Sequence, residues 1–278
     1  MKKVVYSMLV LFIIGVVGTL VSVSASGGFS LDTYNVSDQA VITNKGISEI
    51  EMDLSSTDLA LHPTTDDEIT VDFNGKISKK LKNKITLDVK EKGNKLSIGL
   101  KGEDQIKLNI GVLIIDTKVD VYLPNRVYES LIIDNSSGDI ELKDLNVKEI
   151  SLKTSSGDMI IHNLASSENL FHTSSGEIQL TNIKGDLTAE TSSGDIFIQS
   201  EKTYGDIKAN TSSGDISIEF EENPKSLAIN FNASSGDGEV SLDGVSYEEK
   251  SEHEIRGKIG SGEYELNAHT SSGDFYLK

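Results

Sequence analysis

The tetrapeptide Ser-Ser-Gly-acid recurs through the second half of the chain and limits what the chain can fold into. Its glycines stand 18 to 22 residues apart over five steps and 37 residues apart at the last step. A period near twenty residues, held over several steps, is the sequence signature of a stacked repeat. The seven copies contain Gly138, Gly157, Gly176, Gly194, Gly214, Gly236 and Gly273.

Apolar and polar residues alternate on both sides of each glycine. After Gly214, for example, Ile216 and Ile218 are apolar and Ser217 between them is polar. Alternation with a period of two indicates strands with one buried face and argues against helices. We therefore expect an all-β fold, a parallel β-solenoid (β-helix) with coils of about twenty residues that stabilise one another by stacking. A third apolar position is expected to turn the second corner inward: Leu145, Leu164 and Ile183.

The regular repeat occupies residues 131–278, whereas residues 46–130 have an irregular β pattern. In the irregular part we expect hairpins at Asn74-Gly75 and at Lys92-Gly93-Asn94, because such pairs favour tight turns. We interpret this part as a degenerate continuation that protects the first coil, and a separate cap layer is the alternative. Residues 26–45 are interpreted as a spacer.

Residues 1–25 form an apolar N-terminal segment, expected to be helical and to act as a signal-anchor or a signal peptide. Lys2 and Lys3 precede an uncharged stretch at 4–23, which places the N-terminus in the cytoplasm. The length suits a membrane-spanning helix, whereas the small residues up to Ala25 suit cleavage of a signal peptide. We expect a single-pass protein of the cell membrane with an extracytoplasmic C-terminal domain. Secretion after cleavage near Ala25 is the alternative.

Composition excludes several functions. The chain has no cysteine, so disulfides, thiol catalysis, thiolate metal sites and lipid-modified cysteines are excluded. The net charge is −18, and without Lys2 and Lys3 the remaining 24 basic and 44 acidic residues give −20. Such a balance repels nucleic acid and anionic lipid head groups, so we expect no nucleic-acid partner.

The acid that follows each glycine is a candidate ligand. If coils stack in register, these acids form a column, and like charges at strand spacing are unfavourable unless a cation lies between them. Calcium is therefore one interpretation. The favoured one is turn chemistry, in which glycine supplies a positive φ and Ser and Asp side chains bind the turn backbone; it predicts no metal site and no cofactor. The column contains Asp139, Asp158, Glu177, Asp195, Asp215, Asp237 and Asp274.

Threonine precedes the repeated motif in several copies. We interpret this position as a ladder of β-branched residues in stacked strands and not as a set of nucleophiles. The threonines are Thr154, Thr173, Thr191, Thr211 and Thr270.

Catalytic residues are not indicated. His172 and His269 occupy the same slot before the repeated motif, which is expected to face outward, and no nucleophile-elbow motif frames a serine. A β-helical polysaccharide-acting enzyme is the alternative function, because carboxylates are abundant. Against it, the chain has two arginines and no tryptophan, and sugar clefts generally use aromatic platforms. The remaining histidines are His62, His162 and His253.

Two irregularities near the C-terminus are candidate interaction sites. A charged insertion at 246–254 interrupts the repeat and is either a binding loop or a tolerated insertion. The sequence stops at Lys278, directly after the expected strand 275–277. If that strand is uncovered, its edge can pair with another strand, so we expect end-on self-association or partner docking there.

The order of these motifs resembles the DUF4097 family, bacterial β-solenoid proteins described as adhesins. The resemblance rests on Val-Asp-Val-Tyr-Leu-Pro at 119–124, on residues 131–140, and on the repeated Thr-Ser-Ser-Gly-Asp-Ile, and it covers roughly residues 45–278. With its N-terminal segment the chain is also similar to membrane-anchored Bacillus-type members associated with cell-envelope stress. The resemblance implies a non-enzymatic, adhesin-like surface protein that binds or scaffolds at the cell envelope. Its partner would be an envelope polymer or a membrane or surface protein.

Overall fold

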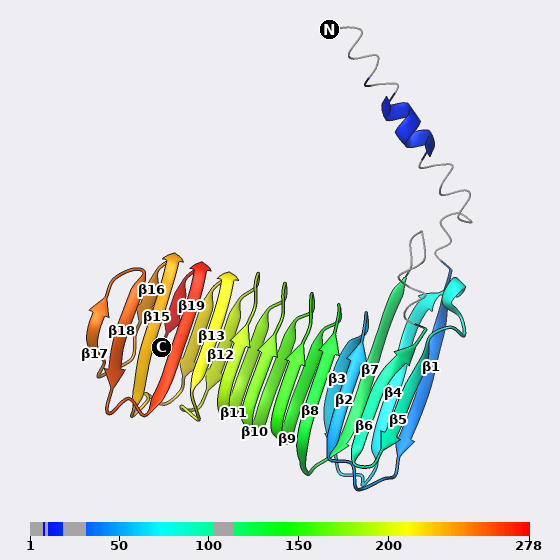
Figure 1. Cartoon of the computed structure of the whole chain (residues 1–278), viewed down its shortest axis with the longest axis horizontal. Helices are drawn as coiled ribbons and strands as arrows, with labels where there is room; N and C mark the ends of the chain where they lie inside the picture. The colour runs from blue at the N-terminus through cyan, green and yellow to red at the C-terminus, as the bar shows by residue number, and fades with distance from the viewer. Residues whose placement is uncertain (1–7, 9–10, 19–31, 103–113) are drawn as a thin grey trace.

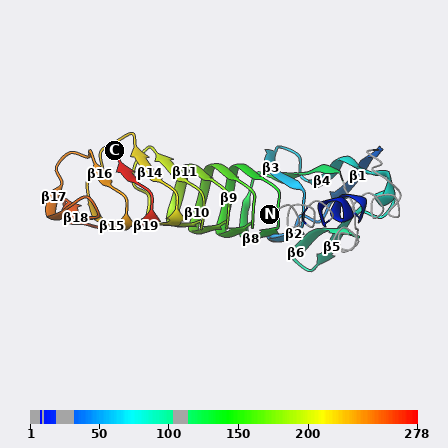
Figure 2. The same ribbon diagram turned by 90° about the horizontal axis from the view of Figure 1, so that it is seen from above.

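The computed structural model describes residues 8, 11–18, 32–102 and 114–278, and this part of the chain is predominantly β. Its strands run side by side along one elongated stack (Figure 1). Seen from above, the stack has two layers joined at their edges by turns (Figure 2). Residues 11–18 are helical, and among the described residues no helix has both the length and the apolar character needed to cross a membrane.

We call the two layers sheet 1 and sheet 2. The spatial order of strands in sheet 1 is β5 (Thr86–Lys92), β6 (Lys95–Lys101), β2 (Glu49–Leu54), β8 (Val127–Asn135), the second halves of β9 (Ile140–Lys153), β10 (Met159–His172) and β11 (Ile178–Glu190), then β13 (Ile207–Ser213), β19 (Tyr264–Ser272), β15 (Leu227–Ser235), β18 (Glu254–Ile259) and β17 (Ser246–Lys250).

Sheet 2 carries the other half of each coil. Its spatial order is β1 (Thr33–Ile42), β4 (Ile69–Ser78), β7 (Ile115–Pro124), β3 (Asp58–Thr64), the first halves of β9, β10 and β11, then β12 (Ile196–Ser200), β14 (Ile216–Phe220), β20 (Phe275–Leu277) and β16 (Gly238–Val240).

The parallel arrangement predicted from the repeat holds through the middle of the stack. Met159 of β10, for example, is paired with Ile140 of β9 on one side and with Ile178 of β11 on the other. Equivalent apolar residues therefore lie above one another between the sheets, and they form one continuous core. Near one end of this core the rings of Phe231 and Phe275 are stacked with centroids 4.7 Å apart.

The second corner of three regular coils depends on a residue that the sequence analysis missed. Strands β9, β10 and β11 pass from one sheet to the other at Asp144, Asn163 and Asn182, whose φ angles are 53°, 54° and 54°. Asn and Asp adopt this left-handed conformation more readily than other residues with a Cβ. Leu145 and Leu164 follow two of these residues and are buried, as predicted.

The side chains at this corner also connect the coils. Asn163 Nδ2 donates a hydrogen bond to Asp144 Oδ1 at 2.7 Å, and Asn182 Nδ2 donates to Asn163 Oδ1 at 3.4 Å. The backbone N–H of Glu201 donates to Asn182 Oδ1 at 3.1 Å. The side chains at this corner therefore form a column of hydrogen bonds that connects successive coils.

The irregular N-terminal part is joined to the stack by strand pairing. Strands β2 and β3 pair in parallel with the first regular coil, whereas β1, β4 and β5 pair only antiparallel. The purely parallel solenoid that we expected is therefore wrong at both ends, since β17 and β18 are antiparallel as well. Part of the expected spacer, residues 33–42, forms β1.

One of the two expected hairpins is wrong. The turn at Lys92-Gly93-Asn94 is confirmed, because it joins the antiparallel strands β5 and β6. Asn74 and Gly75 instead lie inside β4, between β1 and β7. A Cβ on Gly75 would lie 2.2 Å from the carbonyl oxygen of Asp116, so this glycine permits close packing of β7 where we expected a turn.

The coils at the C-terminal end do not follow the order of the chain. Strand β19 pairs with β13 on one side and β15 on the other, and β20 pairs with β14 and β16 (Figure 1). The last coil is therefore inserted between two earlier ones. The expectation that the strand 275–277 is uncovered is wrong, because both of its edges are paired.

The charged insertion closes the end of the stack. Residues 246–254 form β17 and the start of β18, which fold back on β15 as an antiparallel hairpin. The turn between them lies against the repeated-motif corner, where Gly238 N–H donates to the carbonyl of Glu252 at 2.7 Å and Ala233 N–H donates to the carbonyl of His253 at 2.8 Å. Ile255 is buried. The insertion is thus part of a cap, which neither of our two interpretations anticipated.

Deletion of residues 264–278 tests the inserted coil. The deletion removes the buried side chains of Leu266, Phe275 and Leu277 and leaves four strand edges unpaired, so we expect a loss of more than about 5 kcal/mol in the free energy of unfolding. A synthetic peptide of residues 263–278 should restore much of the loss in chemical denaturation, and a peptide with Leu266→Asp and Phe275→Asp should not. A truncated chain as stable as the full chain would contradict this arrangement.

Candidate functional site

The repeated glycine is required by close contact between coils. A Cβ on Gly194 would lie 2.0 Å from the carbonyl oxygen of Gly176, and one on Gly214 would lie 2.0 Å from the carbonyl oxygen of Gly194. Among the seven repeated glycines only Gly236 has a positive φ, and its value of 159° is close to extended backbone, so our expectation of left-handed glycines in these turns is wrong. The same contact continues through the displaced coil, since Gly273 meets Gly214 and Gly236 meets Gly273.

The threonines of the repeat stabilise the same contact between coils through their hydroxyl groups. Thr191 Oγ1 donates to the carbonyl of Gly176 at 3.2 Å, and Thr211 Oγ1 donates to the carbonyl of Gly194 at 3.1 Å. Both threonines are buried, where a hydroxyl needs a partner. Their role is therefore a cross-coil hydrogen bond as well as the expected β-branched packing.

The acidic column is bonded to the backbone of the neighbouring coil. The N–H of Asp158 donates to Asp139 Oδ1 at 2.9 Å, and the N–H of Asp215 donates to Asp195 Oδ1 at 2.8 Å. These are the turn bonds we favoured, except that they run between coils. Among the described residues no three His, Asp or Glu side chains are grouped so as to hold a metal ion.

Gly194→Ala tests the close contact at this corner. The added methyl group would displace the backbone of the next coil, and we expect a loss of about 3 kcal/mol or more, or at least about 6 °C in melting temperature. The matched control is Ser193→Ala, which changes an exposed side chain in the same turn and should leave the melting temperature within about 1 °C. Equal effects of the two substitutions would show that close packing is not the reason for glycine.

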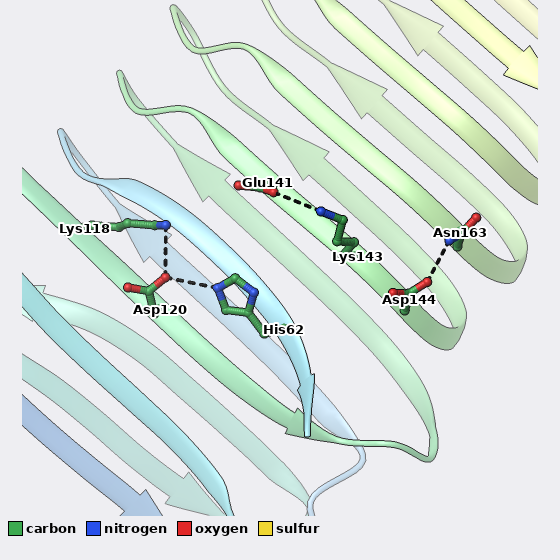
Figure 3. A network of polar contacts seen from close by, with 7 residues as sticks. All are labelled: His62, Lys118, Asp120, Glu141, Lys143, Asp144 and Asn163. Carbon is green, nitrogen blue, oxygen red and sulfur yellow. Dashed lines mark hydrogen bonds and ion pairs between the residues drawn. The ribbon is translucent and has the colours of Figure 1, made fainter. Parts of the chain in front are cut away.

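The histidines are distributed over the outer surface. His62 Nε2 lies 3.1 Å from Asp120 Oδ1, and the ring of His62 stacks on Tyr122 with centroids 5.2 Å apart. Lys118 Nζ lies 3.1 Å from the same carboxylate oxygen (Figure 3). Figure 3 also shows separate pairs on the next strands of the stack, such as Lys143 with Glu141 at 3.7 Å.

The predicted outward slot of His172 and His269 is confirmed. His172 Nδ1 lies 4.0 Å from Glu190 Oε2 on the neighbouring strand, and His269 Nδ1 contacts the backbone and side-chain oxygens of Asn232. His253 Nδ1 lies 2.7 Å from the carbonyl oxygen of Gly236, within the cap. These three histidines thus make structural contacts at three separate places.

A hollow on the outer face of sheet 1 is the most distinctive surface site. It has a volume of about 400 Å³ and lies over β13, β19, β15 and β18. Strand pairing places its outward side chains in two rows across these four strands. The first row is Lys208, Asn267, Asn230 and Arg256, and the second is Asn210, His269, Asn232 and Glu254. We call this site the amide hollow.

The shape of the amide hollow follows from side-chain length. Asn267 and Asn230 are short and lie on the two middle strands, whereas Lys208 and Arg256 are long and lie on the flanking strands. The floor includes Phe231 and Ala268, whose side chains are buried in the core. The result is a polar trough between two long cationic side chains.

The charges around the amide hollow are balanced. Lys208 Nζ lies 2.7 Å from Glu190 Oε1, and Arg256 Nε lies 3.1 Å from Glu254 Oε1. The hydrogen bond from Lys208 holds the pKa of Glu190 below its ordinary value, and a bond from Asn210 at 3.1 Å adds to the effect. Two cations and two anions thus cancel here, in a chain whose net charge is −18.

The lowered pKa of Glu190 predicts a pH dependence. Because this carboxylate binds protons more weakly in the folded chain than in the unfolded chain, its contribution to stability is complete above the ordinary glutamate pKa of about 4.3 and is lost as the pH falls toward the folded value. Lys208→Met should make the fall in the free energy of unfolding between about pH 5 and 3 less steep, as measured by denaturant titrations. Lys258→Met, which removes an exposed lysine of β18, should not; equal slopes for both variants would contradict the assignment.

Sequence reasoning missed the amide hollow. Its rows combine residues 208, 230, 256 and 267, which are neighbours only because the last coil is displaced. One signal was present, however. Asparagine is depleted in strands, yet Asn210, Asn230, Asn232 and Asn267 all occupy outward strand positions.

Comparison with solved structures finds several proteins of similar extent. One is a candidate cell adhesion protein from Clostridium sporogenes, with 13% identity, covering 88% of this chain and 99% of that one, and a TM-score of 0.42. A candidate adhesin from Bacteroides fragilis has 13% identity, coverage of 90% and 98%, and a TM-score of 0.43. A candidate lipid-binding protein from Parabacteroides distasonis has 16% identity, coverage of 88% and 97%, and a TM-score of 0.43.

A search of curated proteins finds no match. The family model described as Toastrack DUF4097 matches residues 47–184 and 125–278, which together include most of the described strands. The match agrees with the resemblance stated from the sequence. The chain belongs to the Toastrack DUF4097 family.

Proposed function

We propose that this chain is a non-enzymatic, extracytoplasmic surface protein that binds or scaffolds at the cell envelope through the sides of its β stack. Residues 4–23 would hold it to the cell membrane as a single span; secretion after cleavage near Ala25 is the alternative. The membership in an adhesin-like family supports the surface role. The lysines before an uncharged segment support the orientation.

The observation that carries the proposal is the closure of the C-terminal end of the stack. The last coil is paired on both sides, and the hairpin of β17 and β18 covers the end of sheet 1. The strand 275–277 thus offers a partner no free edge, whereas the broad outer faces of the two sheets remain open to one. This also removes the basis for end-on self-association through the strand 275–277.

A binding role is better supported than a polysaccharide-acting enzyme. A glycosidase needs two carboxylates facing each other across the scissile bond. In this chain the repeated acids accept backbone hydrogen bonds along one corner, as Asp195 and Asp215 do. The outer-face carboxylates of Asp120 and Glu190 are paired with lysines at 3.1 and 2.7 Å. Two classes of partner follow. One is an envelope polymer. The other is a membrane or surface protein of the envelope-stress response, and the similarity to Bacillus-type members favours this second class.

Fractionation and cross-linking of intact cells test this proposal. A C-terminally tagged full chain should appear in the membrane fraction with residues 1–25 attached, and cross-linking should recover it with an envelope component. Pulled-down material is identified by mass spectrometry for proteins and by sugar analysis for polymers. Recovery of the chain in the cytosol, or hydrolysis of envelope polysaccharide by the purified chain, would contradict the proposal.

A further inference from the structure

We infer that the amide hollow is a binding site for an uncharged, hydroxyl-rich oligosaccharide segment. This inference rests on the proposed envelope function and deepens it by naming the site and the class of ligand. The hollow lies on β13, β19, β15 and β18, at the end of the stack opposite β1 (Figure 1). The side chains of its two rows, apart from half-buried Asn210, are exposed on the outer face.

The hydrogen-bonding groups of the hollow are mixed and partly unused. Asn230 Nδ2 donates to Asn267 Oδ1 at 3.2 Å. Within the described chain this leaves Asn230 Oδ1 as a free acceptor and Asn267 Nδ2 as a free donor. A flip of either amide exchanges its two ends but still leaves polar groups facing outward. A sugar hydroxyl both donates and accepts, so neighbouring donors and acceptors suit it better than a row of like groups.

The second row repeats this pattern. Asn210 Nδ2 donates to Glu190 Oε1 at 3.1 Å, which leaves Asn210 Oδ1 as an acceptor. His269 uses Nδ1 to contact Asn232, so its Nε2 has no partner among the described residues. Adjacent strands are roughly 4.8 Å apart, so the two rows offer polar groups at regular intervals along a trough. An extended sugar chain has hydroxyls along its length and can use such a series.

The charge balance argues for a neutral ligand. The cations Lys208 and Arg256 are each paired with a carboxylate within 3.1 Å. An anionic polymer would have to compete with Glu190 and Glu254 for them, and it would also approach a chain of net charge −18. A cationic polymer would meet the two cations that form the walls. A neutral, hydroxyl-rich chain neither competes with these carboxylates nor is repelled by the two cations.

The chemistry of the hollow also disfavours a protein partner at this place. Protein interfaces concentrate their binding energy in buried aromatic and arginine anchors that fill pockets. Here the aromatic residue, Phe231, points into the core and stacks on Phe275. Without an aromatic platform, binding of one segment rests on hydrogen bonds of modest net value. We therefore expect a dissociation constant on the order of 1 mM for one hollow, and a lower apparent dissociation constant where many copies face a polymer.

The test measures binding of two neutral probes, cellohexaose and fully N-acetylated chitohexaose, to the full chain in phosphatidylcholine nanodiscs by equilibrium dialysis. At least one probe should bind with millimolar affinity. The double variant Asn230→Val/Asn267→Val should weaken binding about tenfold or more, and valine should keep the strands intact because it favours β structure. The matched control, Ser151→Val/Ser217→Val, changes outward residues of sheets 1 and 2 outside the hollow and should leave binding unchanged.

Three results would overturn the inference. These are no binding of either hexamer at 10 mM, equal binding by the wild type and the Asn230→Val/Asn267→Val chain, or tighter binding of hexagalacturonate than of both neutral probes. Binding of the same proteins to isolated envelopes separates this inference from the proposed function. If the wild type and the variant bind envelopes equally, the envelope role stands and the hollow is not its site. If the wild type does not bind envelopes, the proposed function fails.

Discussion

Close contact between backbones at the repeated glycine is the constraint on which the rest of this structure depends. At Gly194 a single added methyl carbon would lie 2.0 Å from the carbonyl oxygen of Gly176. Because the coils approach so closely, the buried threonine can reach the same carbonyl and the acid can accept an N–H from the next coil. The spacing thus sets the register of strands in both sheets, and the register aligns the apolar residues into one core.

The same contact orders the coils at the C-terminal end. Gly273 lies on Gly214 and Gly236 lies on Gly273, so the last copy of the motif sits between two earlier copies. This order leaves room for the β17–β18 hairpin at the end of the stack. It also assembles the amide hollow from strands that are distant in the sequence. The insertion at 246–254 therefore supplies the chain length that this rearrangement needs.

The regular part of the fold could be predicted from the sequence, because each copy of the motif repeats the same local pattern. Leu164 was correctly placed in the core, and His269 was correctly placed on the outer face. The left-handed corner at Asn163 was missed, since Asn is compatible with many turns. Gly75 was misread because glycine permits both turns and close packing, and only the neighbouring strand decides between them. The candidate site at Asn230 depended on the coil order, which local patterns do not encode.

Disulfide cross-linking tests the coil order most directly, because the chain has no native cysteine. Ser217 lies beside Tyr276, and Tyr276 lies beside Glu239. Ser217→Cys/Tyr276→Cys should cross-link efficiently under mild oxidation, because adjacent strands bring the Cα atoms within the range of a disulfide. Ser217→Cys/Glu239→Cys should not, because one strand lies between them. The opposite result, in which only the second pair cross-links, would show coils stacked in chain order and contradict the account.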